Sequence, residues 1–205
     1  MVPELKFASS WDDGSEFDGN IMELLMRYKL PGTFYLPGVN PKSDMVMEYI
    51  ENGFEVGAHT ATHPADLKLL DDTLLRNEIV INKHALEKII GRKVTKFCYP
   101  RGRYDERAIA ILKELGFTEA RTTVVLKTAW DDPFRTDTAI HVFQRGEYED
   151  RDWANIAARM VRQAAELNEV FHIWGHGWEI ERDKNWDKLN GFFSWLTENY
   201  KIISI

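Results

Sequence analysis

The chain has little of three features that would place it in a specialised class of protein. It has one cysteine, Cys98, in 205 residues, so no intrachain disulfide can form. No apolar run approaches transmembrane length, and residues 1–7 lack the apolar stretch of a signal peptide. We therefore expect a cytoplasmic protein that does not enter a membrane.

Positive charge is also in deficit. The chain has 26 Lys and Arg against 33 Asp and Glu, a formal net charge of −7. Nucleic acids and anionic membrane surfaces are bound by basic patches, so we expect neither as a partner. The sequence also lacks internal repeats, low-complexity segments and linker-like changes of composition, and it indicates no obligate protein partner. A single domain over residues 1–205 is the prediction.

Strand-like apolar runs alternate with amphipathic helical patterns along the chain. The predicted strands are 5–10, 33–36, 54–58, 96–99, 117–123, 140–143, 170–174 and 201–205. The predicted helices are 19–28, 43–52, 71–90, 105–115, 152–167 and 185–199. So many βα-type units in one domain favour an α/β fold, a distorted or incomplete (β/α) barrel of about seven parallel strands.

Three polar segments directly follow predicted strands, and together they have the residues of a hydrolytic metal site. They are Trp11-Asp12-Asp13-Gly14, His59-Thr60-Ala61-Thr62-His63 and Trp174-Gly175-His176-Gly177. The ends of parallel strands meet at one face of such folds, where active sites collect. Two histidines and a carboxylate are a common zinc ligand set with one position open. A further carboxylate and histidine supply a base and an acid.

Each segment taken alone also has an ordinary structural interpretation. An Asp-Asp-Gly sequence is common in solvated turns. Adjacent strand residues point opposite ways, so Asp12 and Asp13 reach one site only if the chain turns, as Gly14 permits. His59 and His63 share a face if their segment forms a helical turn, and are otherwise surface histidines of a loop.

The remaining histidines are expected to be structural. His172 lies in the middle of a predicted strand, which favours a hydrogen-bonded position in the core. His84 and His141 have no partner pattern around them. In a further turn, Tyr99-Pro100-Arg101-Gly102, the flanking Pro and Gly can hold the Arg101 N–H outward, available to an anion.

The identity and order of these segments resemble the polysaccharide deacetylase family, also known as carbohydrate esterase family four or the chitooligosaccharide deacetylase homology domain. The matches to its motifs are Asp12-Asp13-Gly14, His59 to His63, Pro100-Arg101-Gly102 and His176. The resemblance extends over about residues 5–176. It implies a hydrolase that removes acetyl groups from N-acetylated sugars or oligosaccharides.

The resemblance also implies a role for each matched residue. The general base would be Asp12, the metal ligands Asp13, His59 and His63, the general acid His176, and an oxyanion donor the backbone N–H of Arg101. The metal in this family is usually zinc, although some members bind other divalent ions.

Two motif positions depart from the family pattern. Many members have an arginine that tethers the base where this chain has Cys98, and Arg121, at the end of a neighbouring strand, is our candidate to replace it. The family's Asp-and-Trp motif has no clear counterpart. Asp152-Trp153 is nearest, but it reads as a helix start with Asp152 as N-cap.

The expected substrate-binding residues are aromatic. Trp174 and Trp178 flank His176, and Tyr99 precedes the third motif, so these rings are candidates to stack on sugars in a groove at the rim. Core packing is the alternative for any single tryptophan. Two other functions stay open: an O-acetyl sugar esterase or cyclic amide hydrolase on the same fold, and a degenerate barrel that binds carbohydrate without turnover.

Overall fold

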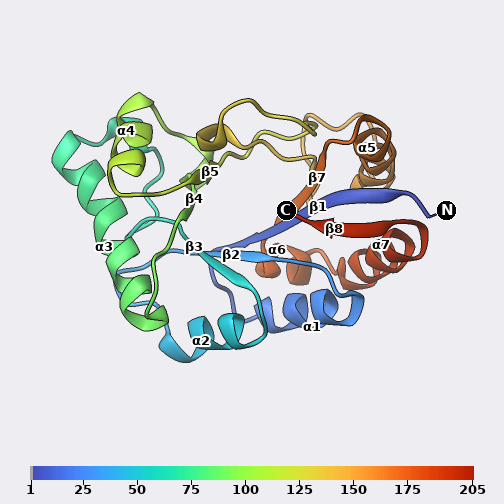
Figure 1. Cartoon of the computed structure of the whole chain (residues 1–205), viewed down its shortest axis with the longest axis horizontal. Coiled ribbons are helices and arrows are strands. Elements are labelled where there is room, and N and C mark those ends of the chain that lie inside the picture. Colours follow the sequence, from blue (N-terminus) through green and yellow to red (C-terminus); the bar gives the residue numbers. More distant parts are fainter. Residues whose placement is uncertain (1) are drawn as a thin grey trace. The chain divides into compact units, whose positions relative to one another are not determined.

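Strands and helices alternate along the chain, as the sequence predicts (Figure 1). The computed structural model describes residues 2–205. The chain divides into two compact units, which are described separately. Unit 1 contains the residues up to Gly32 together with Val124–Ala129 and Asp137–Ile205, and unit 2 contains Thr33–Thr123 and Trp130–Thr136.

The strands of unit 1 are all paired in parallel. They are β1 (Glu4–Asp12), β6 (Ile140–His141), β7 (Val170–Gly175) and β8 (Lys201–Ser204). β1 pairs with β7 and with β8, and β7 pairs with β6. The register opposes Trp11 to Gly175, so the residues that follow β1 and β7 leave the sheet at the same level.

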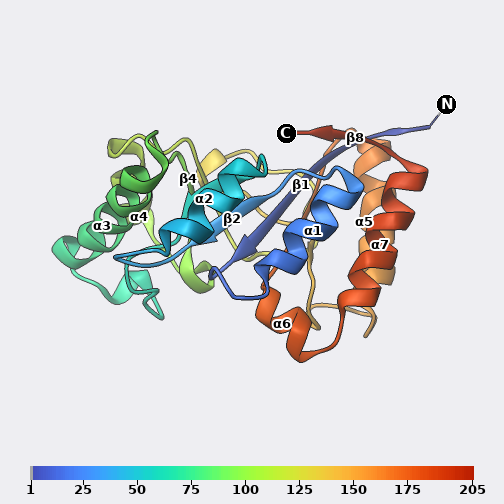
Figure 2. The same cartoon turned by 90° about the horizontal axis from the view of Figure 1, so that it is seen from below.

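The helices of unit 1 cover these strands with apolar faces. They are α1 (Asp18–Tyr28), α5 (Trp153–Leu167), α6 (Gly177–Arg182) and α7 (Trp186–Asn199). Figure 2 shows α5 and α7 running side by side, and their contact includes Trp153 packed edge-on against Phe192. The Asp152 side chain accepts a hydrogen bond from the Ala154 N–H, which confirms the predicted N-cap of α5.

Unit 2 has four parallel strands in the order β2 (Thr33–Leu36), β3 (Glu55–Ala58), β4 (Lys96–Cys98) and β5 (Glu119–Arg121). Its helices are α2 (Ser43–Glu51), α3 (Asp72–Ile90) and α4 (Glu106–Glu114). Three single-turn 3-10 helices complete the unit: η1 (Leu67–Leu69), η2 (Pro100–Gly102) and η3 (Pro133–Arg135). Asp71 and Asp105 cap α3 and α4, because each carboxylate accepts backbone N–H groups of the first turn.

The predicted fold class, an α/β distorted barrel with parallel strands and surrounding helices, is confirmed. Two predicted strands are shorter than expected: 117–123 contracts to Glu119–Arg121, and 140–143 to Ile140–His141. The short helix α6 was not predicted, because six residues are too few for a visible periodic pattern. None of the helices within residues 2–205 has both the length and the apolar character of a membrane span.

Candidate active site

The parallel register of β1 and β7 places the first and last sequence motifs next to each other in unit 1. Asp12 ends β1, and His176 directly follows β7. His176 Nε2 lies 3.7 Å from Asp13 Oδ2. The chain turns at Asp13 (φ 78°) and again at Gly14 (φ 65°). The turn expected at Gly14 therefore starts one residue earlier, at the backbone of Asp13.

Trp178 lies beside this pair and is 38% exposed. Its indole Nε1 donates a hydrogen bond of 3.2 Å to Asp13 Oδ2, and its ring centroid is 5.2 Å from that of His176. The Arg182 guanidinium lies 5.4 Å from the centroid of the Trp178 ring. The exposed indole thus lies next to Asp13 and His176, the position at which the sequence predicts a wall of a sugar groove.

Sequence reasoning missed Glu179, the closest polar partner of His176. Glu179 is 7% exposed, and its Oε2 accepts from His176 Nδ1 at 2.5 Å and from His141 Nε2 at 2.8 Å. His176 is the N-cap of α6 and Glu179 is its third residue, a spacing at which capping side chains interact. That spacing was the available signal. His141, expected to be structural, joins the same cluster through the two-residue strand β6.

The charges of this cluster follow from its hydrogen bonds. Burial by itself would raise the pKa of Glu179, but the hydrogen bonds from His141 and His176 outweigh it and hold this pKa at about 2. Burial disfavours charge on His176, yet the hydrogen bond to Glu179 and the nearby Asp12 and Asp13 carboxylates raise its pKa overall. Burial lowers the pKa of His141 despite Glu179.

His141, His176 and Glu179 could in principle form a metal site, because their side chains are of the types that bind zinc. The geometry instead fits hydrogen bonding. Ligand atoms on one tetrahedral zinc lie roughly 3.3 Å apart, given metal–ligand bonds of about 2.0–2.1 Å. The single oxygen of Glu179 approaches both imidazoles more closely than that, at 2.5 and 2.8 Å.

In unit 2, the second motif forms a tight loop after β3. Of the two conformations that the sequence left open, a helical turn does not form, because Thr60 (φ 69°) and His63 (φ 53°) both have left-handed backbones. The rings of His59 and His63 nevertheless come together, with centroids 4.8 Å apart. His63 N donates to Thr60 Oγ1 at 3.1 Å, so the threonine side chain holds the backbone of this loop.

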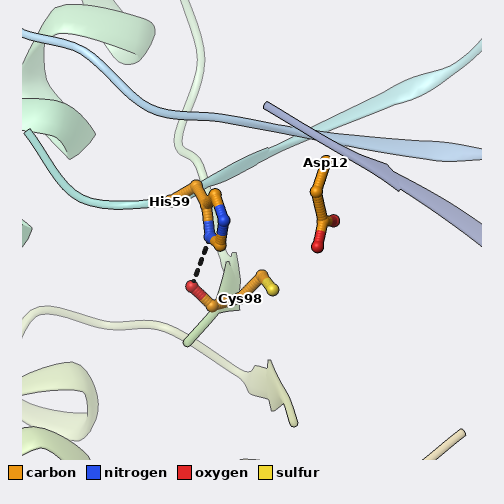
Figure 3. Close-up of side chains that lie close together, drawn as sticks. All are labelled: Asp12, His59 and Cys98. Carbon is orange, nitrogen blue, oxygen red and sulfur yellow. Dashed lines mark hydrogen bonds between the residues drawn. The ribbon is translucent and has the colours of Figure 1, made fainter. Parts of the chain in front are cut away.

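The hydrogen bonds of His59 determine which of its ring nitrogens carries an electron pair for a metal. His59 Nδ1 lies 2.8 Å from the Cys98 carbonyl oxygen, which requires the ring to carry its proton on Nδ1 and leaves Nε2 as the electron-pair donor (Figure 3). The buried Asn82 of α3 accepts from the His59 N–H at 2.9 Å and donates to the carbonyls of Leu36 and Gly38. These contacts tie the loop that follows β3 to the end of β2.

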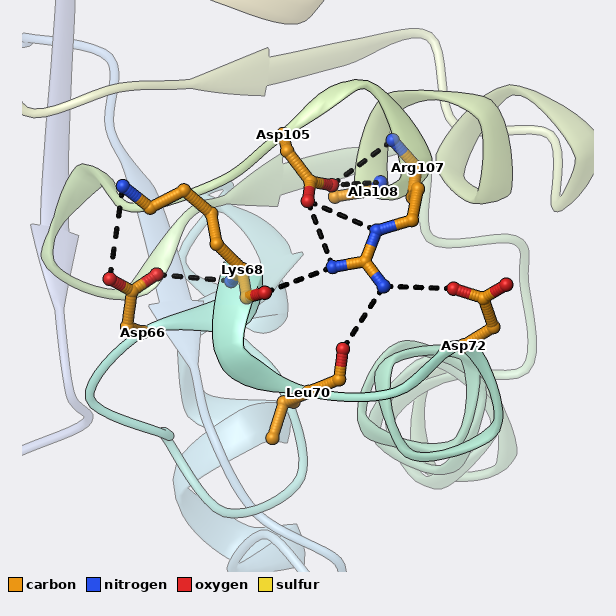
Figure 4. Close-up of polar contacts among 7 residues, drawn as sticks. All are labelled: Asp66, Lys68, Leu70, Asp72, Asp105, Arg107 and Ala108. Carbon is orange, nitrogen blue, oxygen red and sulfur yellow. Dashed lines mark hydrogen bonds and ion pairs between the residues drawn. The ribbon is translucent and has the colours of Figure 1, made fainter.

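Arg107 holds the segment that continues from the second motif (Figure 4). Its guanidinium donates to the carbonyls of Lys68 and Leu70 at 3.0 and 3.1 Å. The same group pairs with Asp72 and Asp105, at the first turn of α3 and the N-cap of α4. A single side chain therefore links this loop to two helices.

The third motif forms the turn η2 with a left-handed Arg101 (φ 55°) whose side chain is exposed. Gly102 has φ 65°, and a Cβ atom there would lie 2.2 Å from Thr123 Oγ1, so no larger residue fits without a shift. The turn is thereby packed against the chain that follows β5.

Cys98 and Arg121 are direct register partners on β4 and β5. Arg121 is 1% exposed. Its guanidinium donates to Cys98 Sγ at 2.9 Å and to the Thr122 carbonyl at 2.9 Å, and lies 5.4 Å from the Tyr35 ring centroid. The candidate arginine therefore lies at the same level of the sheet as position 98, on the adjacent strand.

Two predicted substrate-binding aromatics are corrected by their burial. Trp174 is 3% exposed and stacks on His141, with centroids 3.8 Å apart and planes at 6°. Tyr99 is fully buried, donates from its hydroxyl to the Phe134 carbonyl and stacks on Tyr104. Both rings belong to the core, because a wall of a groove needs an exposed face. His172 is a core residue as expected, with Nε2 2.9 Å from Ser10 Oγ.

Comparison with known proteins agrees with these motifs. The profile described as polysaccharide deacetylase matches residues 2–120, more than half of the chain. The chain therefore belongs to the polysaccharide deacetylase family. His176 lies beyond the matched residues, so its role depends on the structure of unit 1. A search of curated proteins finds no match.

Solved structures share the fold at low sequence identity. A Mycobacterium smegmatis protein assigned as a polysaccharide deacetylase is 14% identical with a TM-score of 0.77, over 98% of this chain and 87% of that one. The peptidoglycan deacetylase PdaC of Bacillus subtilis is 21% identical with a TM-score of 0.69, over 100% and 90%. A family 4 pseudoenzyme of Bacillus anthracis is 18% identical with a TM-score of 0.66, over 100% and 65%.

Proposed function

We propose that this protein is a metal-dependent hydrolase that removes acetyl groups from N-acetylated sugars or oligosaccharides. The observation that carries the proposal is the placement of His176 in a largely buried hydrogen-bonded cluster, with Nε2 3.7 Å from Asp13, the residue that directly follows β1. A member of this family that keeps the family's acid and base residues retains what acetyl transfer to water requires.

The proposed metal ligands are Asp13 of unit 1 and His59 and His63 of unit 2. Their donor chemistry fits a divalent ion such as zinc, because two imidazoles and one carboxylate leave a position open. The Nδ1 contact of His59 to the Cys98 carbonyl supports this assignment, since it places the ring proton on Nδ1 and makes Nε2 the nitrogen with the electron pair that a metal needs. The bound metal would polarise the acyl carbonyl and lower the pKa of water.

The chain's own residues would perform the proton transfers. Asp12 would accept a proton from the attacking water. The Arg101 N–H would donate to the oxyanion, and one such donor is typically worth about 3–4 kcal/mol. His176 would protonate the leaving amine, which is a poor leaving group without that proton. Arg121 is proposed to keep Asp12 ionised, and its buried, charged position supports such a task.

Substrate binding is proposed to use the exposed face of Trp178. Sugar rings present apolar C–H faces that pack on aromatic rings. An O-acetyl sugar esterase or a cyclic amide hydrolase would use the same groups, except that an ester depends less on the acid. The similarity to a family 4 pseudoenzyme keeps a binding protein without turnover as the other candidate.

The deciding experiment measures acetate release by the purified chain. The protein is stripped with a chelator, dialysed, and assayed with and without added zinc on N-acetylglucosamine oligomers and on O-acetyl sugars. We expect zinc-dependent release from the N-acetyl oligomers. Release from O-acetyl sugars alone would establish the esterase, and binding of oligomers with no release from either substrate would establish the non-catalytic function.

A further inference from the structure

The carboxylate of Glu179 is shared by two histidines through one oxygen. His176 Nδ1 lies 2.5 Å and His141 Nε2 2.8 Å from Glu179 Oε2. All three side chains are largely withdrawn from solvent, with side-chain exposures of 15% for His176, 6% for His141 and 9% for Glu179. A buried carboxylate needs such partners, because an unpaired one would not remain charged.

The shared oxygen determines which nitrogen of each ring carries the proton. An ionised carboxylate only accepts hydrogen bonds, so both nitrogens that face it must be donors. His176 therefore carries its fixed proton on Nδ1, and Nε2 is the nitrogen that can exchange one. Nε2 is also the atom that faces Asp13. His141 carries its proton on Nε2, and its buried Nδ1 has no partner among residues 2–205, which keeps this ring neutral.

His141 is itself firmly held. Its ring stacks on Trp174 at 3.8 Å, and its backbone is clamped by Tyr148, whose hydroxyl accepts from the His141 N–H at 2.7 Å and lies 3.2 Å from the His141 carbonyl. The ring is thus fixed by groups that do not reach the reacting atoms. It can hold Glu179 in place without taking part in chemistry.

From these contacts we infer that Glu179 and His141 are positioning residues for the general acid. Glu179 orients the His176 ring and keeps its fixed proton on Nδ1, and His141 immobilises Glu179. The inference rests on the proposed function, since it assigns His176 as the acid. The low pKa of Glu179 supports it, because the carboxylate stays ionised throughout the neutral range.

The test compares Glu179→Gln with Glu181→Gln, a control on the same helix. The Glu181 carboxylate pairs with Lys184 and accepts a hydrogen bond from Trp186, and it does not contact His176. His141→Phe is the third variant, since it keeps an aromatic ring against Trp174. Each zinc-loaded protein is assayed on N-acetyl oligomers and on 4-nitrophenyl acetate, whose phenolate departs without protonation. Bound zinc and Tm are measured alongside.

We expect Glu179→Gln to lower kcat for the oligomer by about 10²-fold or more, the usual contribution of a general acid, with KM and bound zinc unchanged. Ester hydrolysis should fall by less than about 3-fold, because it does not need the acid. His141→Phe should give a loss of about 10-fold on the oligomer, and Glu181→Gln none. Equal losses on both substrates, or an unchanged kcat on the oligomer, would overturn the inference.

A second readout does not depend on turnover. The ¹⁵N resonances of the His176 ring should report the Nδ1–H tautomer in the wild type and an added Nε2–H population in Glu179→Gln. Identical His176 spectra in the two proteins would refute the positioning role. Failure of the wild type to release acetate from any substrate would instead refute the proposed function, while the spectra would still decide whether Glu179 sets the tautomer.

Discussion

The indole nitrogen of Trp178 donates a hydrogen bond of 3.2 Å to Oδ2 of Asp13. Asp13 directly follows β1, and Trp178 lies on α6 after β7, the strand that pairs with β1. The side chain expected only as a wall for substrate therefore also contacts the proposed metal ligand. A carboxylate with one oxygen engaged by an N–H has its other oxygen oriented for a metal. Under the proposed function, Trp178 therefore has two roles: its exposed face would bind sugar, and its N–H would orient the proposed metal ligand Asp13.

These two roles of Trp178 separate in two substitutions. Trp178→Phe keeps an aromatic face but loses the N–H, and we expect about 10-fold weaker zinc binding with little change in KM. Trp178→Ala should show the same loss of zinc affinity and, in addition, a raised KM for oligomers. Chelator competition measures the first effect and steady-state kinetics the second. Wild-type zinc affinity in Trp178→Phe would leave the indole with the wall role alone.

The histidine loop of unit 2 is predicted to provide two metal ligands. His59→Ala or His63→Ala should lose tightly bound zinc and most activity, while the helical content and Tm of the metal-free protein change little. The matched control is His84→Ala, since His84 is exposed on α3 outside the loop. Metal analysis after gel filtration and circular dichroism check the outcome. Wild-type zinc content in both loop variants would contradict the ligand assignment.

Asp12 and Asp13 are predicted to differ in what they do, although they are adjacent. Asp12→Asn should retain zinc and lose kcat, because an amide cannot accept the proton of water. Asp13→Asn should lose zinc first. Parallel metal titrations and kinetics of the two variants decide the matter, and loss of zinc in Asp12→Asn with retention in Asp13→Asn would exchange the two roles.

The pairing of Cys98 with Arg121 allows the position of the arginine to be exchanged. If Arg121 keeps Asp12 ionised, then Arg121→Cys should raise the pKa of the base by about 1–3 units and move the acid limb of the kcat/KM profile to higher pH. The double variant Cys98→Arg with Arg121→Cys returns a guanidinium to the neighbouring strand and should move the limb back. An acid limb that does not move in Arg121→Cys would show that this arginine has only a structural role.

Glu179 should make the fold sensitive to acid. Its folded-state pKa of about 2 is below the ordinary value of 4.5, so the stabilisation is complete above about pH 5 and is lost as the pH falls towards 2. A shift of this size corresponds to on the order of 3 kcal/mol. The lowered pKa of His141 also reduces the stability of the fold as the pH falls below 6.5, the ordinary pKa of histidine. The raised pKa of His176 has the opposite effect on stability.

Urea unfolding of the chelated protein between pH 7 and pH 3 tests this dependence. The free energy of unfolding should fall more steeply with decreasing pH in the wild type than in Glu179→Gln, because the glutamine cannot titrate. Glu181→Gln serves as the control and should follow the wild type. Parallel curves for all three proteins would assign the acid sensitivity to other groups.

The sequence was sufficient to predict most of the elements and the motif segments, because both depend on local patterns. The polar residues after β1, β3 and β7 were recognised from their positions at strand ends. Glu179 was missed because its role requires a turn that folds the first residues of α6 back onto His176. His141 was missed because β6 has only two residues, and their register against β7 cannot be derived from periodicity.

Exposure was the property that sequence reasoning judged least well. Trp174 and Trp178 are four residues apart and flank the same histidine, yet one is 3% and the other 38% exposed. The difference arises because Trp174 still belongs to β7, whereas Trp178 lies on α6 after the chain has turned. The turn between β7 and α6 thus places Trp174 in the core and Trp178 at the surface.

The left-handed backbones at Asp13, Thr60, His63 and Arg101 set a limit on how stable this protein can become without losing its site. Each such non-glycine residue costs roughly 1 kcal/mol or more relative to glycine in the same conformation. The side chains of Asp13 and His63 are proposed metal ligands, and that of Thr60 holds the histidine loop. Glycine at any of these three positions would therefore relieve the strain but reduce activity. At Arg101 only the backbone N–H is proposed to act, so of the four it is the position where relief of this strain removes no proposed side-chain role.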